Sequence, residues 1–259
     1  MGDDGRRTDT VRVTGFGDAD ERPHAPGSTS AWSETWEWRL VLDDAALAVV
    51  VVLVRRPFES RMSYICAVLG HGRDTVAVVE HEIALPRGGS LELRASGIWA
   101  DHICETPFSH WNLGLEAFGL TVEDPDDALG PGRGIRTPVG LDVEWEDDAP
   151  PRMLGTADGY LAVGRAHGEV LVGVEHHDVI GVGHRLHRWG TGPRLTPWTG
   201  SAGRAIDGNG ASVGLVAGRA AADDGTGAVT DWVLSTGPTE APAPSVLSSR
   251  CRFGESYLT

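Results

Sequence analysis

The stretch WEWRLVLD, residues 36–43, alternates between two kinds of side chain. Trp36, Trp38, Leu40 and Leu42 share one side of an extended chain, while polar residues fall mostly on the other. This two-residue period is typical of a half-buried β-strand. Residues 43–46 then suit a turn, and LAVVVVLV (47–54) is apolar throughout. The two segments predict a strand, a turn and a returning strand that is buried on both faces.

Strand-like segments recur along the rest of the first half of the chain. Further strands are predicted at residues 61–69, 75–85, 90–95 and 140–146, with turns at 70–74 and 86–89. Residues 110–124 are ambiguous, because their apolar positions alternate and then slip near Ala117 and Phe118. They fit a strand with a bulge or a short helix. Few segments have a helical period, so the sequence predicts an all-β protein, a sandwich or a barrel.

Pro150 and Pro151 mark a predicted joint between two β-domains, at residues 31–150 and 151–259. Residues 1–30 are polar and rich in Gly and Pro, and we expect a largely mobile lead-in there. In the second domain, residues 159–190 predict a meander of three short strands, with turns near 166–168 and 174–176. Two more strands are predicted at 211–220 and 227–235.

Composition narrows the classes of function. The 259 residues carry a formal net charge of −15, so an acidic surface would repel nucleic acid. The chain has no lysine, which excludes Schiff-base chemistry and a Walker A phosphate loop. Three scattered cysteines predict reduced thiols and a cytoplasmic location. The N-terminus lacks an apolar stretch typical of a signal peptide, and the longest apolar run is too short for a membrane span.

Two glycine-containing motifs and the histidines are candidate sites of chemistry. GASVG (210–214) matches a nucleophile motif and GPGRG (130–134) a nucleotide-binding loop, but neither has the strand–turn–helix context that it needs. Ten histidines are present, yet none has a recognised metal-ligand spacing. We therefore expect no metal and no cofactor, with a metal site assembled from distant strands as the alternative.

WADHICETPFSHW, residues 99–111, concentrates reactive and aromatic side chains. Trp99 and Trp111 supply apolar area, and Asp101, His102 and Glu105 supply polar groups. Carboxylates and imidazoles buried beside indoles acquire shifted pKa values, which suits acid–base chemistry. The stretch therefore predicts the wall of a pocket. The alternative is that these polar groups only hydrogen-bond to nearby backbone and hold a turn.

Two motifs resemble the carotenoid hydratase (hydroxyneurosporene synthase) superfamily and its actinobacterial relatives. The first is GIWADHICETPFSHWNLGLEAFGL (97–120), and the second is GVGHRLHRWG (181–190). Leu186 stands where the family has an aspartate. The resemblance implies two consecutive lipocalin-like β-domains that share a cleft, and hydratase or polyene-cyclase activity. It also implies that His187 and Trp189 work with a carboxylic acid.

Together these observations predict a cofactor-independent cyclase or hydratase for a hydrophobic polyene, terpenoid or polyketide. The alternatives are a non-catalytic binding protein for such a molecule and a metal-dependent enzyme of cupin type. The oligomeric state is left open. The predicted catalytic residues are Asp101, His102, Glu105 and His187, and the predicted substrate-binding residues are Trp38, Trp99, Trp111, Trp189 and Trp198.

Overall fold

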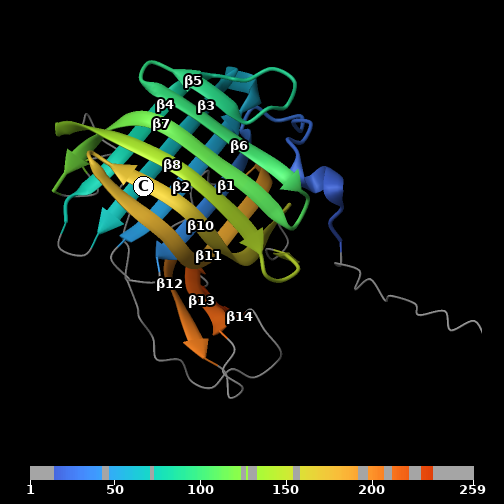
Figure 1. Ribbon diagram of the computed structural model, residues 1–259. Helices are drawn as coiled ribbons and strands as arrows, with labels where there is room; N and C mark the ends of the chain where they lie inside the picture. The colour runs from blue at the N-terminus through green and yellow to red at the C-terminus, as the bar shows by residue number, and fades with distance from the viewer. Residues whose placement is uncertain are drawn as a thin grey trace, which may run out of the picture.

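A computed structural model describes most of the chain (Figure 1). Residues 15–42, 47–70, 73–123, 127, 133–153 and 158–191 are described, with the backbone alone at 152–153 and in three strands between 198 and 235. The helices whose bounds lie within these residues are two short 3-10 turns, η1 (Asp18–Glu21) and η2 (Pro57–Glu59). Neither helix of this described part is long and apolar enough to cross a membrane. The predicted all-β fold is confirmed.

The described strands form two antiparallel sheets. The larger sheet has 11 strands, and the smaller has three, β12 (Trp198–Ile206), β13 (Ser212–Ala221) and β14 (Val229–Ser235). The strands of the larger sheet are β1 (Trp32–Leu42), β2 (Leu47–Arg56), β3 (Arg61–Gly70), β4 (Thr75–Ala84), β5 (Glu92–Ala95), β6 (Ile98–Thr106), β7 (His110–Val122), β8 (Ile135–Asp147), β9 (Arg152–Met153), β10 (Gly159–Val172) and β11 (Glu175–Thr191).

The larger sheet closes on itself. Its order is β4-β3-β2-β1-β11-β10-β8-β7-β6-β5, and the end of β7 also pairs with the start of β4, as Val122 does with Thr75. Eight described strands, β1–β4, β7, β8, β10 and β11, therefore make a closed antiparallel ring. The first part of β7 pairs instead with β6, which fills the wall where β4 and β7 diverge. Closure gives the sheet one inner and one outer face.

The alternation in residues 36–43 determines which side chains of β1 face the inside of the barrel. Trp36, Trp38, Leu40 and Leu42 all belong to one buried apolar cluster, to which the other strands of the ring contribute alternate residues. The predicted burial of residues 47–54 on both faces is also confirmed, because Val50 on the outer face is only 3% exposed. Large side chains therefore fill the inside of the barrel.

Of the two alternatives for residues 110–124, the strand is confirmed as β7, and one prediction about the next segment is corrected. Residues 159–190 form two long strands and not three short ones, since β10 runs through the predicted turn near 166–168. Gly168 has a φ of +136°, which glycine adopts readily, so the backbone is irregular there while pairing with β8 and β11 continues.

The predicted joint at Pro150–Pro151 lies between β8 and β9. The larger sheet continues across it, because β10 pairs with β8 and β11 pairs with β1. The strands β12–β14, which follow β11, form a sheet of their own. The division into two lipocalin-like domains stays a prediction.

Candidate functional site

One end of the barrel is covered by the segment before β1. Residues 15–24, which include η1, lie beside the turn between β6 and β7 (Figure 1). Glu21 is 2% exposed and accepts a hydrogen bond from the backbone N–H of Phe108 in that turn, at 2.9 Å. Part of the predicted lead-in thus contributes buried side chains to the barrel.

Arg185 of β11 ties this segment to the barrel wall. Its guanidinium donates to both carboxylate oxygens of Glu21, at 2.5 and 3.0 Å. It also donates to Asp147 at the end of β8, with Nε at 2.8 Å from Oδ1, and to the hydroxyl of Tyr160 at 3.1 Å. The Arg185 side chain is only 2% exposed, so this buried cation is paired with two buried carboxylates.

His187, two residues further along β11, connects this cluster to a third carboxylate. Its Nδ1 lies 3.3 Å from the Tyr160 hydroxyl, and its Nε2 lies 3.0 Å from Oε1 of Glu34 in β1. Trp36 stacks on the imidazole, with ring centroids 4.5 Å apart. Burial lowers the pKa of His187 below its ordinary value, although Glu34 acts in the opposite direction.

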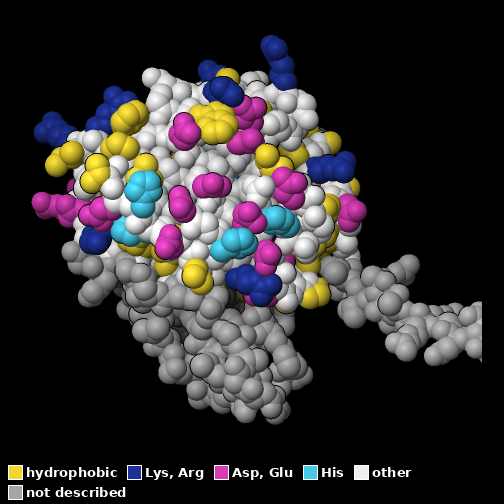
Figure 2. Space-filling model, viewed as in Figure 1, with side chains coloured by type: hydrophobic (Ala, Val, Ile, Leu, Met, Phe, Trp, Pro, Cys, Tyr) yellow, Lys and Arg dark blue, Asp and Glu magenta, His cyan; other side chains and the backbone are white. Residues whose placement is uncertain are grey.

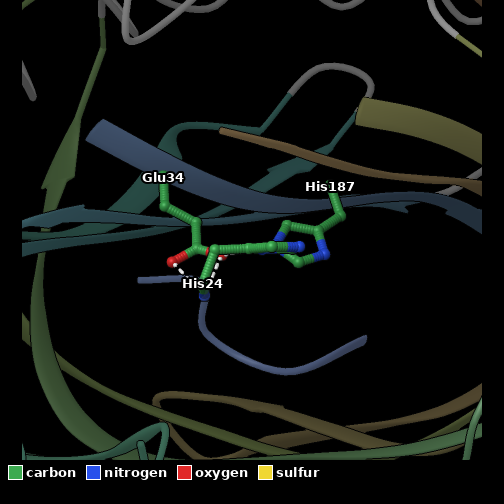
Figure 3. Close-up of side chains that lie close together, drawn as sticks. All are labelled: His24, Glu34 and His187. Atoms are coloured by element: carbon green, nitrogen blue, oxygen red, sulfur yellow. Dashed lines mark hydrogen bonds and ion pairs between the residues drawn. The ribbon is translucent and has the colours of Figure 1, made fainter. Parts of the chain in front are cut away.

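Glu34 is the centre of a second group of contacts (Figure 3). Its Oε1 lies 2.7 Å from Nδ1 of His24, and its Oε2 accepts a hydrogen bond from Arg55 at 3.0 Å. Nε2 of His24 lies 3.2 Å from Oδ1 of Asp20. Burial acts to raise the pKa of Glu34, but hydrogen bonds from His187 and His24 outweigh it and leave this pKa lowered.

The middle of the barrel contains polar atoms that have no hydrogen-bond partner among the described residues. The indole nitrogens of Trp36, Trp38 and Trp111 are buried and unpaired, as are the Tyr64 hydroxyl and both ring nitrogens of His102. Four of these side chains form a chain of ring contacts: His102 stacks on Tyr64 at 5.6 Å and lies 5.7 Å from Trp38, and Trp38 lies 5.2 Å from Trp111. Burial lowers the pKa of His102 to about 3, so its imidazole is neutral.

Unpaired buried polar groups are uncommon in folded proteins, since each costs about 1–3 kcal/mol. Here they gather on the inner face of one barrel, among aromatic rings. Indole N–H groups can only donate, so the complement that they lack is a hydrogen-bond acceptor.

Comparisons with known proteins give a family. A family model described as "Domain of unknown function (DUF7064)" matches residues 17–243. The chain belongs to this family. A search of curated proteins gives no match.

Solved structures similar to this DUF7064 protein include kievitone hydratase from Nectria haematococca. The identity is 12% and the TM-score 0.47, over 89% of this chain and 67% of that one. A candidate AttH protein from Nitrosomonas europaea has 11% identity and a TM-score of 0.39, over 78% and 67% of the two chains.

The structure brings some of the predicted site residues together on the inner face. His102, Trp38 and Trp111 lie in the middle of the barrel, and His187 lies at the covered end. Trp111 connects the residues in the middle of the barrel with those at the covered end, because the guanidinium of Arg185 at that end is 5.9 Å from its ring. Trp189 is partly buried and stacks on His24, with ring centroids 3.7 Å apart.

Other predicted site residues are not brought to this face. Asp101 and Glu105 are partly or fully exposed on the outer face of β6, and Trp99 there is 37% exposed. Figure 2 shows that this side of the barrel carries many acidic and histidine side chains. Geometry therefore does not support Asp101 or Glu105 as acids beside His187. The side chain of Trp198 lies outside the described residues.

Several residues of the site were not predicted: Glu21, His24, Glu34, Tyr160 and Arg185. A signal for Glu34 was present, because it shares the two-residue period of Trp36 and Trp38 and so places a carboxylate on the apolar face. The only sequence signal for Arg185 is its place in the second motif, residues 181–190. No spacing in the sequence could indicate that His24 meets Glu34 and His187.

Proposed function

We propose that this DUF7064 protein is a cofactor-independent enzyme that acts on a hydrophobic polyene, terpenoid or polyketide bound inside the barrel. The observation that supports this proposal is the set of unpaired polar atoms on Trp36, Trp38, Tyr64, His102 and Trp111. A ligand oxygen placed among them would supply the missing acceptor. Because side chains fill the interior, entry of a ligand requires some of these rings to change rotamer.

The same side chains could accelerate ring closure. Aromatic walls that hold a long chain folded would remove much of the entropic barrier to joining its ends. Donors such as the indole N–H groups would stabilise negative charge developing on a ligand carbonyl oxygen. Neither effect requires a metal or a prosthetic group.

Hydration of an alkene, in contrast, begins with proton donation by a neutral acid. The carboxylates that face the inside of the described barrel are each paired with arginine, Glu34 with Arg55, and Glu21 and Asp147 with Arg185. Burial acts to raise the pKa of Glu34, but hydrogen bonds from His187 and His24 outweigh it, and the lowered pKa favours the ionised form of the carboxylate beside His187. We therefore favour cyclisation without an added proton over hydration.

The second candidate is a protein that binds such a molecule without changing it. The same unpaired atoms support this alternative, because binding needs the acceptor but no reaction. The mass of the recovered ligand separates the candidates: a cyclase returns an isomer, a hydratase adds one water, and a binding protein returns the ligand unchanged.

Binding is tested with all-trans-retinol, a polyene with one hydroxyl, by following the quenching of tryptophan fluorescence. We expect Trp38→Phe and His102→Leu to weaken binding about tenfold, because each removes one buried polar partner. Trp99→Phe is the matched control. Trp99 lies on the outer face of β6, so this variant should bind the probe normally. If the parent protein does not bind the probe, or if Trp99→Phe weakens binding as much as Trp38→Phe, the interior site is wrong.

A further inference from the structure

We propose that His24, Glu34 and His187 form a binding site for a divalent transition-metal ion. Each residue offers one ligand atom, and these three atoms lie within 4.8 Å of one another (Figure 3). The residues come from three separate parts of the chain: the segment before β1, β1 itself and β11. This inference does not rest on the proposed function, because none of the unpaired polar atoms in the middle of the barrel is among its ligands.

The donor set suits such an ion. Two imidazole nitrogens and one carboxylate oxygen are the ligands found in many zinc sites, and imidazole also suits cobalt and nickel. Arg55 occupies Oε2 of Glu34 at 3.0 Å, which leaves Oε1 to bind through a single oxygen. Glu34 and His187 are 0% and 1% exposed, whereas His24 is 19% exposed and gives the ion a route to solvent.

The outward ring nitrogens have the partners that a metal site requires. Histidine ligands generally donate their second N–H to a carboxylate or another oxygen, which fixes the ring. Nε2 of His24 lies 3.2 Å from Oδ1 of Asp20, and Nδ1 of His187 lies 3.3 Å from the Tyr160 hydroxyl. With an ion between the rings, both outward nitrogens would carry the hydrogen that these oxygens accept.

A competing explanation is a hydrogen-bond network without an ion. In that network Nδ1 of His24 must donate to Glu34 at 2.7 Å, and Nε2 of the same ring faces the carboxylate of Asp20. A neutral imidazole has one N–H and can satisfy only one of these acceptors, so the network without an ion requires His24 to be protonated on both nitrogens. The metal-bound arrangement pairs both nitrogens of a neutral ring, and metal titration separates it from the protonated network.

An ion at this site would hold the segment before β1 against two strands. Of the three ligands, only His24 belongs to that segment. Binding of the ion would therefore favour the arrangement in which the segment covers the end of the barrel. Metal should therefore raise the melting temperature and protect the amides around His24 from hydrogen exchange.

The experiment uses the full chain, purified without a polyhistidine tag and treated with a chelator that is then removed. Co²⁺ is added while its visible d–d absorption is recorded, and Zn²⁺ binding is measured by calorimetry. We expect one equivalent of each ion to bind. His24→Ala should weaken binding more than tenfold, and Asp20→Asn about tenfold, because loss of an outer partner typically costs 10–100-fold in metal affinity.

The matched controls are His110→Ala and His167→Ala. Both histidines lie on the outer face and share Oε2 of Glu144, at 3.3 and 3.2 Å. These variants should bind the ion as the parent does. The proposal is overturned if the parent binds no stoichiometric ion, if His24→Ala binds normally, or if the surface variants lose binding instead. Circular dichroism of each variant establishes that it is folded, and Asp20→Asn decides the matter if His24→Ala is not.

Discussion

At the residue scale, His102 shows what an unpaired buried imidazole does to stability. Its pKa is lowered from 6.5 to about 3 by burial, so the folded protein keeps it neutral. The unfolded chain takes up a proton near pH 6.5. Between these values the unfolded state binds more protons, and the free energy of unfolding therefore falls as the pH falls.

The prediction is that the free energy of unfolding depends on pH with the slope expected for the uptake of one proton. Above pH 6.5 the contribution of His102 to stability should be fully present, and from there down to about pH 3 it should decrease by about 1.4 kcal/mol per pH unit. Urea unfolding of the parent and of His102→Phe at pH 7, 6 and 5 measures the difference in slope. Equal slopes for the two proteins would show that His102 titrates normally in the folded state.

The same substitution should separate stability from binding. At pH 8, His102→Phe keeps a ring of similar size against Tyr64 and removes two unpaired nitrogens. We expect the variant to be more stable by about 1–3 kcal/mol and to bind retinol less tightly. Thermal unfolding and fluorescence titration of one preparation test both effects. A lower melting temperature would mean that the nitrogens have partners and that His102 is a structural residue.

At the element scale, β10 and β11 depend on glycines that let neighbouring strands approach. A Cβ added at Gly183 would lie 1.9 Å from the backbone oxygen of Arg39 in β1. That oxygen belongs to the strand pairing, so it cannot move aside as a flexible side chain would. An alanine at this position must therefore push β11 away from β1.

Gly183→Ala should destabilise the protein by about 3 kcal/mol, the upper part of the range for overpacking. Gly17→Ala is the control, since a Cβ there meets nothing within 4 Å and the effect should stay within about 0.5 kcal/mol. Chemical denaturation of both variants gives the comparison. Similar stability for the two variants would contradict the close approach of β1 and β11.

The same elements show which features the sequence could predict. Alternation located the strands and the inner face, because a two-residue period depends only on neighbouring residues. The same rule places Asp101 and His102 on opposite faces of one strand, so they could not share a pocket. The alternation in β1 likewise put Glu34 with the buried tryptophans.

Long-range pairing was beyond the sequence. Glu34 and His187 meet because β1 pairs with β11, and these residues are 153 positions apart. The register of that pairing depends on closure of the whole barrel. The expectation of no metal rests on ligand spacing alone, and spacing does not report on residues that strand pairing brings together, which is why a site assembled from distant strands is its alternative.

At the scale of the whole molecule, the segment before β1 and the closed sheet act as one unit. Arg185 reaches from β11 to Glu21 in that segment and to Asp147 in β8. His24 of the segment contacts Glu34 in β1. Two groups of contacts, which are connected through Tyr160 and His187, thus fasten the segment across one end of the barrel.

Removing the positive charge of Arg185 should destabilise the whole fold. Arg185→Met would leave Glu21 and Asp147 buried without their partner, and breaking a buried ion pair in this way typically costs about 3–5 kcal/mol. Glu21→Gln is milder, because the amide keeps a hydrogen bond to the guanidinium and Asp147 still balances its charge. We expect it to lower global stability little while loosening the segment.

Hydrogen exchange measured by mass spectrometry distinguishes these effects. In Glu21→Gln the peptide containing residues 15–31 and the Phe108 amide should exchange faster than in the parent, while the strands of the barrel stay protected. In Arg185→Met protection should fall throughout the barrel. Glu59→Gln, in the exposed turn η2, is the control and should leave exchange unchanged. Unchanged exchange at residues 15–31 in Glu21→Gln would mean that the contacts of His24 alone hold the segment in place.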